Sequence, residues 1–339
     1  MALNPQIRML HLMKDVKPSM RLAAGEDFAS WQTRARARLG ELLGLPMERT
    51  DPNYRVEWTD DSNPTFTETR FLFESEPEVT VIGHLLVPRN APQEKLPMII
   101  CLQGHSKGMH ISLGRPKYEG DEKTISGGDR DFACQIVARG QIALALEQRG
   151  FGDRGGTEKG PACYQPAVQA MLMGKTLIGQ RCWDISRAID VVGEHFPQVD
   201  MDHIAIMGNS GGGTATIYAA ALDERIGAAM PSCAFCGYLP SIGAQYHCLC
   251  NYVPGIMKEF DMGDLAGLIA PRPMIVVNGK DDTIFPLESA REQADVARTY
   301  YAAAGAPEKF EHVVGPEGHR FYAALGWPVF DRLTGWKKA

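Results

Sequence analysis

The amino-acid sequence predicts an α/β fold, in which a mostly parallel central sheet is covered by helices on both faces. Three observations support this prediction. From about residue 98 onward, short apolar runs typical of buried strands alternate with longer segments of helical periodicity. Two runs of alternating polarity precede them, and a glycine-flanked serine, Ser210, stands between one strand and one helix. We expect the 339 residues (1–339) to form a single domain, because no linker or low-complexity tract divides them.

The first residues of the chain, 1–50, are expected to form a helical N-terminal extension packed on this domain. Within it, residues 27–43 place Phe28 and Trp31 on one apolar face of a helix, and Gly44 follows as a stop signal. The extension is therefore interpreted as part of the main body rather than a separate domain.

An antiparallel hairpin is expected next, at one edge of the sheet, because residues 67–74 and 80–87 alternate in polarity around a short turn. The parallel strands are expected at 98–102, 142–146, 204–207, 227–231, 274–278 and 311–314. The helices are expected at 131–139, 176–195, 214–222, 287–304 and 321–333.

Two long segments, 104–128 and 234–273, interrupt this alternation as irregular loops. Loops of such length inside a compact domain are usually functional. Each follows the carboxyl end of a predicted strand, which is where open α/β sheets bind ligands. We therefore expect both loops to lie over the active site.

Composition and charge exclude several classes of partner. Hydrophobic residues make up 44% of the chain and charged residues 22%, as in an ordinary globular protein. The net charge of −6 argues against a nucleic acid partner. No run of about 18 apolar residues is present, which predicts no membrane span, and the missing signal-peptide pattern favours a cytoplasmic location. Assembly into a homo-oligomer is left open.

The eight cysteines do not predict a disulfide scaffold in a chain of this length. Cys233, Cys236, His247, Cys248 and Cys250 lie close in sequence, but their spacing fits no common zinc motif. Small buried side chains and loop packing explain such residues without a metal. We expect no metal and no cofactor, and a local disulfide is left open.

Ser210 is the predicted nucleophile. It lies in Gly-Asn-Ser-Gly-Gly (208–212), after an apolar strand and before a helix rich in small residues. Such a sharp turn strains the serine backbone, and the glycines at both ends relieve the crowding between neighbouring side chains. The combination of strand, Gly-x-Ser-x-Gly and helix is the nucleophile-elbow pattern of serine hydrolases.

A serine hydroxyl needs a base to take its proton and an acid to orient that base. Among the nine histidines, His312 and His319 follow a plausible acid loop. We favour His319, which lies in a turn, over His312, which lies inside the last strand. In the preceding turn, the pattern Gly-x-x-Asp-x-x-apolar-Pro favours Asp282 over Asp281 as the acid.

Two backbone N–H groups are expected to bind the developing oxyanion, and the loss of one such donor costs roughly 3 kcal/mol. Gly211, directly after the nucleophile, supplies one. The second is expected from the loop after 98–102, at His105, with Ser106 as the alternative. The charged residues of 147–154 are expected to form a structural ion-pair network.

Several motifs act in combination: Gln-Gly-His-Ser at 103–106, Arg-Gly-Phe-Gly at 149–152, Leu-Met-Gly-Lys-Thr-Leu at 172–177, the serine motif at 208–213, the segment 264–273, Gly-x-x-Asp at 279–282 and Gly-His at 318–319. From about residue 56 to the C-terminus, the chain thereby resembles the α/β-hydrolase superfamily, within it the acetyl xylan esterase-like branch related to dienelactone hydrolase. The resemblance implies metal-independent ester hydrolysis by a triad of Ser210, Asp282 and His319. Gln103 departs from it, because relatives often have histidine at that position.

This resemblance implies a short-acyl (acetyl) esterase that acts on acetylated sugars or similar small esters through an acyl-serine intermediate. The expected partner is a small-molecule or oligosaccharide ester. The same fold and triad would serve a methylesterase of uronic-acid esters or a serine peptidase or amidase. Outside the enzymes, the alternative is a binding protein without catalytic activity. The intact order of serine, acid and histidine argues against this alternative.

Overall fold

The computed structural model describes residues 3–89 and 95–336, whose strands form one nine-stranded sheet in the order β1-β2-β3-β5-β4-β6-β7-β8-β9. Neighbours from β1 through β2 and β3 to β5 are antiparallel, and those from β5 through β4 to β9 are parallel. The predicted mostly parallel sheet with an antiparallel edge is therefore confirmed. The strands are β1 (Arg55–Asp60), β2 (Phe66–Glu76), β3 (Val79–Pro88), β4 (Leu96–Leu102), β5 (Ile142–Leu146), β6 (Val199–Asn209), β7 (Ile226–Ser232), β8 (Met274–Gly279) and β9 (Phe310–Gly315).

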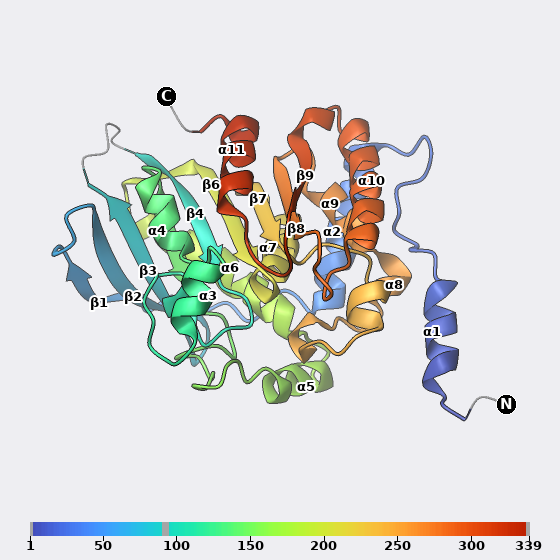
Figure 1. Cartoon of the computed structure of the whole chain (residues 1–339), viewed down its shortest axis with the longest axis horizontal. Helices are drawn as coiled ribbons and strands as arrows, with labels where there is room; N and C mark the ends of the chain where they lie inside the picture. The colour runs from blue at the N-terminus through green and yellow to red at the C-terminus, as the bar shows by residue number, and fades with distance from the viewer. Residues whose placement is uncertain (1–2, 90–94, 337–339) are drawn as a thin grey trace.

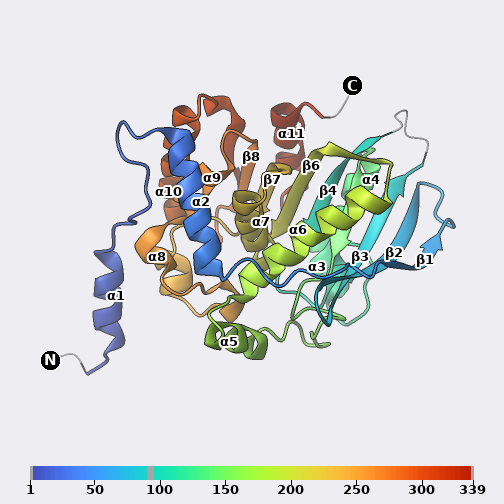
Figure 2. The same cartoon turned by 180° about the vertical axis from the view of Figure 1, so that it is seen from behind.

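Helices cover both faces of this sheet (Figures 1 and 2). Buried side chains of α2, α6, α7, α9 and α10 belong to the core on one face, and those of α4 and α11 to the core on the other. The helices are α1 (Gln6–Lys14), α2 (Phe28–Leu43), α3 (Asp121–Gly127), α4 (Phe132–Ala138), α5 (Tyr164–Leu172), α6 (Leu177–His195), α7 (Gly211–Leu222), α8 (Ile256–Glu259), α9 (Met262–Ile269), α10 (Leu287–Ala303) and α11 (Ala323–Thr334).

The central strand β4 shows how the sequence produces these two cores. All of its residues, LPMIICL, are buried. Successive side chains of a strand point to opposite faces, so Met98 and Ile100 enter one core while Ile99 and Cys101 enter the other. Because the parallel strands share one direction, the loops that follow β4, β6, β8 and β9 all leave the same edge of the sheet.

The predicted helical extension is present as α1 and α2, although residues 1 and 2 lie outside the described residues. The helix α2 begins at the N-cap Asp27, whose side chain accepts a hydrogen bond from the N–H of Ser30, and ends at Gly44 with a φ of 74°. It buries Trp31 and Leu39, whereas α1 buries no residue. That the chain is one domain stays a prediction.

Two elements were not predicted, and the long loops contain helices. Every residue of β1 is exposed, so its sequence lacks a buried face. The helix α5 had no expected counterpart either. The segment 104–128 contains α3, and 234–273 contains α8 and α9; all eight residues of α9 are buried. With only eight residues, α9 is too short to give a clear helical period, so the sequence did not reveal it as a helix. No helix within the described ranges is long and apolar enough to cross a membrane.

Candidate active site

Ser210 lies in the sharp turn between β6 and α7. Its backbone has φ 55° and ψ −121°, a conformation that residues other than glycine rarely adopt. A Cβ atom on Gly208 would lie 2.5 Å from the backbone of Gly212, and one on Gly212 would lie 2.2 Å from the carbonyl oxygen of Leu102. Both glycines are therefore needed for the turn that presents Ser210.

His319 and Asp282 come together from the loops that follow β9 and β8. The Nδ1 atom of His319 lies 2.8 Å from Oδ2 of Asp282. The other carboxylate oxygen, Oδ1, accepts hydrogen bonds from the N–H groups of Ile284 at 2.9 Å and Phe285 at 3.2 Å. With Nδ1 facing the carboxylate, Nε2 of His319 is the ring nitrogen left to exchange a proton with a substrate or nucleophile.

The carboxyl group of Asp282 is held in its ionised form. Burial is the largest influence and opposes ionisation, but the hydrogen bonds from His319 and from the backbone lower the pKa of Asp282 below its ordinary value. Asp281 is exposed. His312 contacts Oδ1 of Asn278 at 3.1 Å within the sheet, and burial lowers the pKa of His312 to about 4. The structure thus brings Asp282 and His319 together and leaves Asp281 and His312 out of this pair.

The loop after β4 passes directly beside Ser210. A Cβ atom on Gly104 would lie 3.0 Å from Cβ of Ser210, and one on Gly211 would lie 2.5 Å from the imidazole of His105. The N–H of Ser106 donates to the carbonyl oxygen of Gly104 at 2.7 Å, whereas the N–H of His105 has no acceptor within the described residues. Of the two predicted alternatives, His105 is therefore the one whose N–H is available to a substrate oxygen.

A cavity of about 450 Å³ opens at Ser210. Besides Ser210, its lining comes from His105, from residues 161–164, from residues 246–249 and 251, and from residues 284–285, and it contains no Lys, Arg, Asp or Glu. The segment 234–273 thus contributes to the site as expected, whereas 104–128 contributes only His105. Residues 161–164 were missed, because their position depends on contacts with residues distant in sequence, such as the hydrogen bonds of Ala162 to Gly150 and of Arg181 to Cys163, and not on a local motif.

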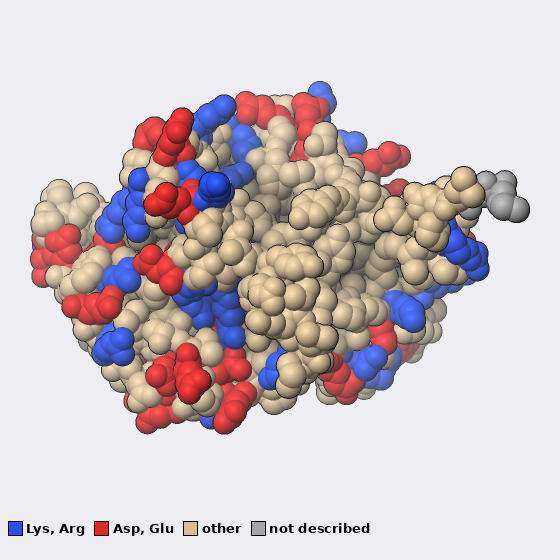
Figure 3. All heavy atoms as spheres, turned by 90° about the horizontal axis from the view of Figure 1, so that it is seen from below, with Lys and Arg blue, Asp and Glu red and all other residues tan. Residues whose placement is uncertain are grey.

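Uncharged side chains gather at the centre of the face on which α5 lies (Figure 3). Seen from the end of the molecule where α5 lies, a charge-free area occupies the centre, with acidic and basic side chains around it (Figure 3). The sequence of α5, YQPAVQAML, contains no charged residue. Two tyrosines that line the cavity are exposed to solvent, Tyr164 at 69% and Tyr246 at 98%. The approach to Ser210 therefore offers aromatic and other neutral side chains.

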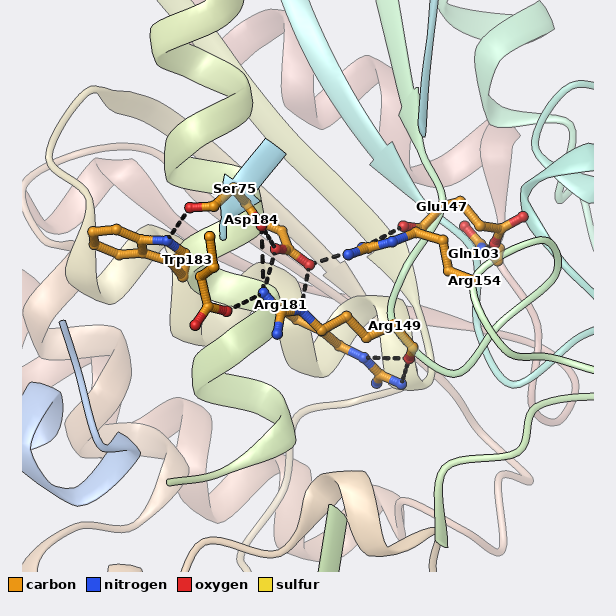
Figure 4. Close-up of polar contacts among 9 residues, drawn as sticks. Ser75, Gln103, Glu147, Arg149, Arg154, Arg181, Trp183 and Asp184 are labelled. Atoms are coloured by element: carbon orange, nitrogen blue, oxygen red, sulfur yellow. Dashed lines mark hydrogen bonds and ion pairs between the residues drawn. The ribbon is translucent and has the colours of Figure 1, made fainter. Parts of the chain in front are cut away.

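An ion-pair network holds the loop that follows β5 (Figure 4). The carboxylate of Asp184 on α6 lies 2.7 Å from Arg149 and 2.8 Å from Arg154, and it accepts a hydrogen bond from Ser75 at 2.6 Å. Arg149 also pairs with Glu76 at 2.5 Å. This network joins α6, β2 and the loop after β5, which is the structural role expected for the charged residues of 147–154.

Glu147, directly after β5, supports the loop that carries His105. Its Oε1 atom accepts hydrogen bonds from Nε2 of Gln103 at 2.6 Å and from the N–H of Met109 at 3.1 Å. Although these bonds favour the carboxylate, burial outweighs them and raises the pKa of Glu147 to about 7. Glu147 therefore ties both ends of residues 103–109 together and titrates near neutral pH.

The cysteines are all free thiols, so no local disulfide forms. The group considered in the sequence does not converge, because Cys233 lies against the aspartate–histidine pair instead. Cys248 and Cys250 lie beside His105 and Cys163, which are distant in sequence.

Comparison with known proteins assigns the chain to a family. Residues 26–242, well over half of the chain, match the family described as acetyl xylan esterase (AXE1). A candidate hydrolase of Bacillus subtilis (strain 168), YtaP, is 28% identical over 289 residues, which cover 81% of this chain and 94% of that protein.

Solved structures show the same fold at lower sequence identity. A candidate acetyl xylan esterase of Bacteroides fragilis NCTC 9343 superposes with a TM-score of 0.77 at 17% identity, over 98% of this chain and 90% of its own. A glucuronoyl esterase of Solibacter usitatus gives 0.68 at 16% identity, over 96% of this chain and 100% of its own. An acetyl xylan esterase from Paenibacillus sp. R4 gives 0.60 at 18% identity, over 96% and 99%. With the sheet order and the family match in agreement, the chain is an α/β-hydrolase that belongs to the acetyl xylan esterase (AXE1) family of carboxylic-ester hydrolases.

Proposed function

We propose that this chain hydrolyses short-acyl esters, above all acetyl esters of sugars, with Ser210 as nucleophile, His319 as general base and Asp282 as the acid that orients it. The observation that carries the proposal is the strained Ser210 turn, at the same sheet edge as the hydrogen-bonded pair of Asp282 and His319. Membership of an esterase family supports the same class of reaction.

In the first half of the proposed reaction, Oγ of Ser210 attacks the carbonyl carbon of the ester while Nε2 of His319 accepts the hydroxyl proton. Asp282 stabilises the imidazolium that forms, because its ionised carboxylate faces Nδ1. The N–H groups of Gly211 and His105 donate to the oxyanion. The C–O bond to the alcohol then breaks, and His319 returns the proton to the leaving oxygen.

In the second half, a water molecule attacks the acyl carbon of the acyl-Ser210 intermediate. His319 takes the proton from this water and then gives it to Oγ as the Ser210 ester bond breaks. The products are the free alcohol and the carboxylic acid, and the enzyme returns to its starting protonation state. The proposed mechanism involves no redox change, and its only co-reactant is one water molecule.

The cavity supports neutral substrates. Its lining lacks charged side chains, and the exposed rings of Tyr164 and Tyr246 offer surfaces on which a sugar ring can stack. An acetylated sugar is a neutral ester of this kind. Methyl esters of uronic acids are also neutral, but their hydrolysis leaves a carboxylate on the sugar with no basic side chain in the lining to receive it.

The test is hydrolysis of p-nitrophenyl acetate by Ser210→Ala, with the exposed Ser62→Ala as the control. We expect kcat to fall by roughly 10⁴-fold or more in Ser210→Ala, since loss of a triad nucleophile costs about this factor or more, and to stay unchanged in the control. An Ser210→Ala variant with full activity would end the proposal.

A substrate panel separates the proposed activity from its alternatives. Acetylated xylo-oligosaccharides, methyl glucuronate esters and aminoacyl anilides are compared by kcat/KM. We expect the acetyl esters to exceed the methyl uronates by at least about tenfold and the anilides by more. A preference for methyl uronates would identify a methylesterase, and a preference for anilides a peptidase or amidase.

A further inference from the structure

Four potential metal ligands from distant parts of the chain converge beside the cavity: His105, Cys163, Cys248 and Cys250. One ligand atom from each lies within 4.8 Å of every other. The closest described contact joins Nε2 of His105 to Sγ of Cys250 at 3.0 Å. Cys163 and Cys250 are buried, and His105 and Cys248 are half-buried. His105, Cys163 and Cys248 line the cavity, so three of the four side chains face it.

The ligand types and their spacing fit zinc. Three thiolates and one imidazole form a common structural zinc site, with tetrahedral geometry and Zn–S distances of about 2.3 Å. That geometry places neighbouring sulfur atoms about 3.8 Å apart. Ligand atoms within 4.8 Å of one another need only a small contraction to reach it. A disulfide would use only two of the thiols and would not explain the approach of the imidazole.

Arg181 supplies an independent observation. It is 1% exposed, and no carboxylate within the described residues forms an ion pair with it. Its Nη2 atom donates to the carbonyl oxygen of Arg149 at 2.7 Å and to Sγ of Cys163 at 3.2 Å, while Nη1 has no hydrogen-bond partner. The guanidinium also lies 4.5 Å from the centre of the Phe151 ring. A buried cation whose one side-chain hydrogen-bond partner within the described residues is a thiol calls for negative charge on the thiol cluster.

We propose that His105, Cys163, Cys248 and Cys250 bind one zinc ion, with Arg181 as the counter-charge. Three thiolates, a neutral imidazole and Zn²⁺ sum to a charge of −1, which the guanidinium of Arg181 cancels. Binding releases the three thiol protons to solvent, because only the thiolate coordinates. The buried cluster is thereby neutral as a whole.

The zinc would be structural. Four protein ligands complete its coordination and leave no position for water or substrate. It would join the loop after β4 to the start of α5 and to the 249–251 turn, which are walls of the cavity at Ser210. The imidazole that binds zinc belongs to the residue whose N–H is the proposed oxyanion donor, so zinc would hold that donor in place without taking part in the chemistry.

Metal content tests the proposal without substrate. The reduced full-length chain is incubated with excess zinc chloride and desalted, and the bound metal is measured by elemental mass spectrometry. We expect about one zinc per chain. Replacement by Co²⁺ is expected to give near-ultraviolet thiolate-to-cobalt charge transfer and intense visible bands of a tetrahedral site, which adventitious surface binding does not produce.

Cys163→Ser and Cys248→Ser are the test variants, and each is expected to lower zinc affinity by roughly 100-fold or more. Because buried Cys163→Ser can fail to fold, the half-buried Cys248→Ser is the second variant, with circular dichroism as the folding check. Cys134→Ser is the matched control, since Cys134 is also half-buried but contacts the carbonyl oxygen of Leu113 instead. It is expected to bind zinc like the native chain.

Two results would overturn the proposal. One is a folded, reduced native chain that retains less than about a tenth of an equivalent of zinc. The other is the loss of two thiols on air oxidation without metal, in a chain that takes up no zinc, which would identify a disulfide switch. Ser210→Ala is expected to bind zinc normally, so failure of the metal site and failure of the proposed hydrolysis are distinguishable.

Discussion

On two sides of the candidate active site, buried charges are balanced by different kinds of groups. On one side, the carboxylate of Asp282 is matched by His319 and two backbone N–H groups. On the other, the guanidinium of Arg181 has a carbonyl oxygen and a thiol as its neighbours. Figure 4 shows the contrast within one region, since Arg149 and Arg154 contact the carboxylate of Asp184 while Arg181 contacts the backbone oxygen of Arg149. The negative charge of Asp282 is thus balanced by protein groups alone. The positive charge of Arg181 is balanced only if the neighbouring thiols are ionised.

The largest effect is expected from a substitution on the side of Asp282 and His319. Asp282→Asn removes the charge that stabilises the imidazolium of His319 and reverses the preferred ring tautomer, so kcat is expected to fall by roughly 10³- to 10⁴-fold. Asp281→Asn, one residue away and exposed, is the control and is expected to keep native activity. Steady-state kinetics on p-nitrophenyl acetate measure both. Equal losses in the two variants would remove Asp282 from the proposed triad.

The second effect concerns Arg181 beside the thiol cluster, and its sign is expected to depend on whether zinc is bound. Arg181→Met replaces a buried, unpaired cation by an apolar side chain, which is expected to be neutral or stabilising by about 1–2 kcal/mol in the metal-free chain. With zinc bound, the same change removes the counter-charge and is expected to destabilise the protein. Urea unfolding with zinc and with a chelator measures the difference. If the substitution changed the free energy of unfolding by the same sign and amount in both conditions, Arg181 would not interact with the charge of the thiol cluster.

The third effect concerns Glu147, which supports the loop between the two sides. An exposed glutamate loses its proton near pH 4.3, whereas burial raises the pKa of Glu147 to about 7 in the folded chain. The folded state therefore holds more protons than the unfolded state between these values, and its stability falls as pH rises through this window. Glu147→Gln cannot ionise at this position. Between pH 4.5 and pH 8, its free energy of unfolding is therefore expected to rise by about 2–3 kcal/mol relative to that of the native chain.

Urea unfolding at both pH values measures this gain. Glu158→Gln, at an exposed glutamate, is the control and is expected to follow the native chain at both pH values. A constant difference between Glu147→Gln and the native chain across the window would contradict a titrating buried carboxyl group.

The sequence predicted the parts of the site that depend on local backbone rules. The turn at Ser210 needs glycine at fixed positions beside it, and the loops of Asp282 and His319 follow strands whose apolar runs are easily recognised. The predicted sheet, its antiparallel edge and the family resemblance are confirmed. The strands, the turn at Ser210 and the loops are visible because each is marked by a pattern of consecutive residues.

The cavity walls could not be predicted in the same way. His105 and Cys250 are 145 residues apart, and their contact depends on how α5 and the 249–251 turn pack against the loop after β4. Tertiary contacts, not a spacing motif, set that arrangement. The same reason explains why Cys233 was grouped with Cys248 in sequence but lies elsewhere in the fold.

Covalent labelling of Ser210 tests the central claim most directly. The native chain is treated with a p-nitrophenyl alkylphosphonate, digested and analysed by peptide mass spectrometry. We predict loss of esterase activity in step with one phosphonyl group on Ser210, and no label in Ser210→Ala. Complete inhibition with Ser210 unmodified, or with the label on another residue, would contradict the assignment of Ser210 as the nucleophile.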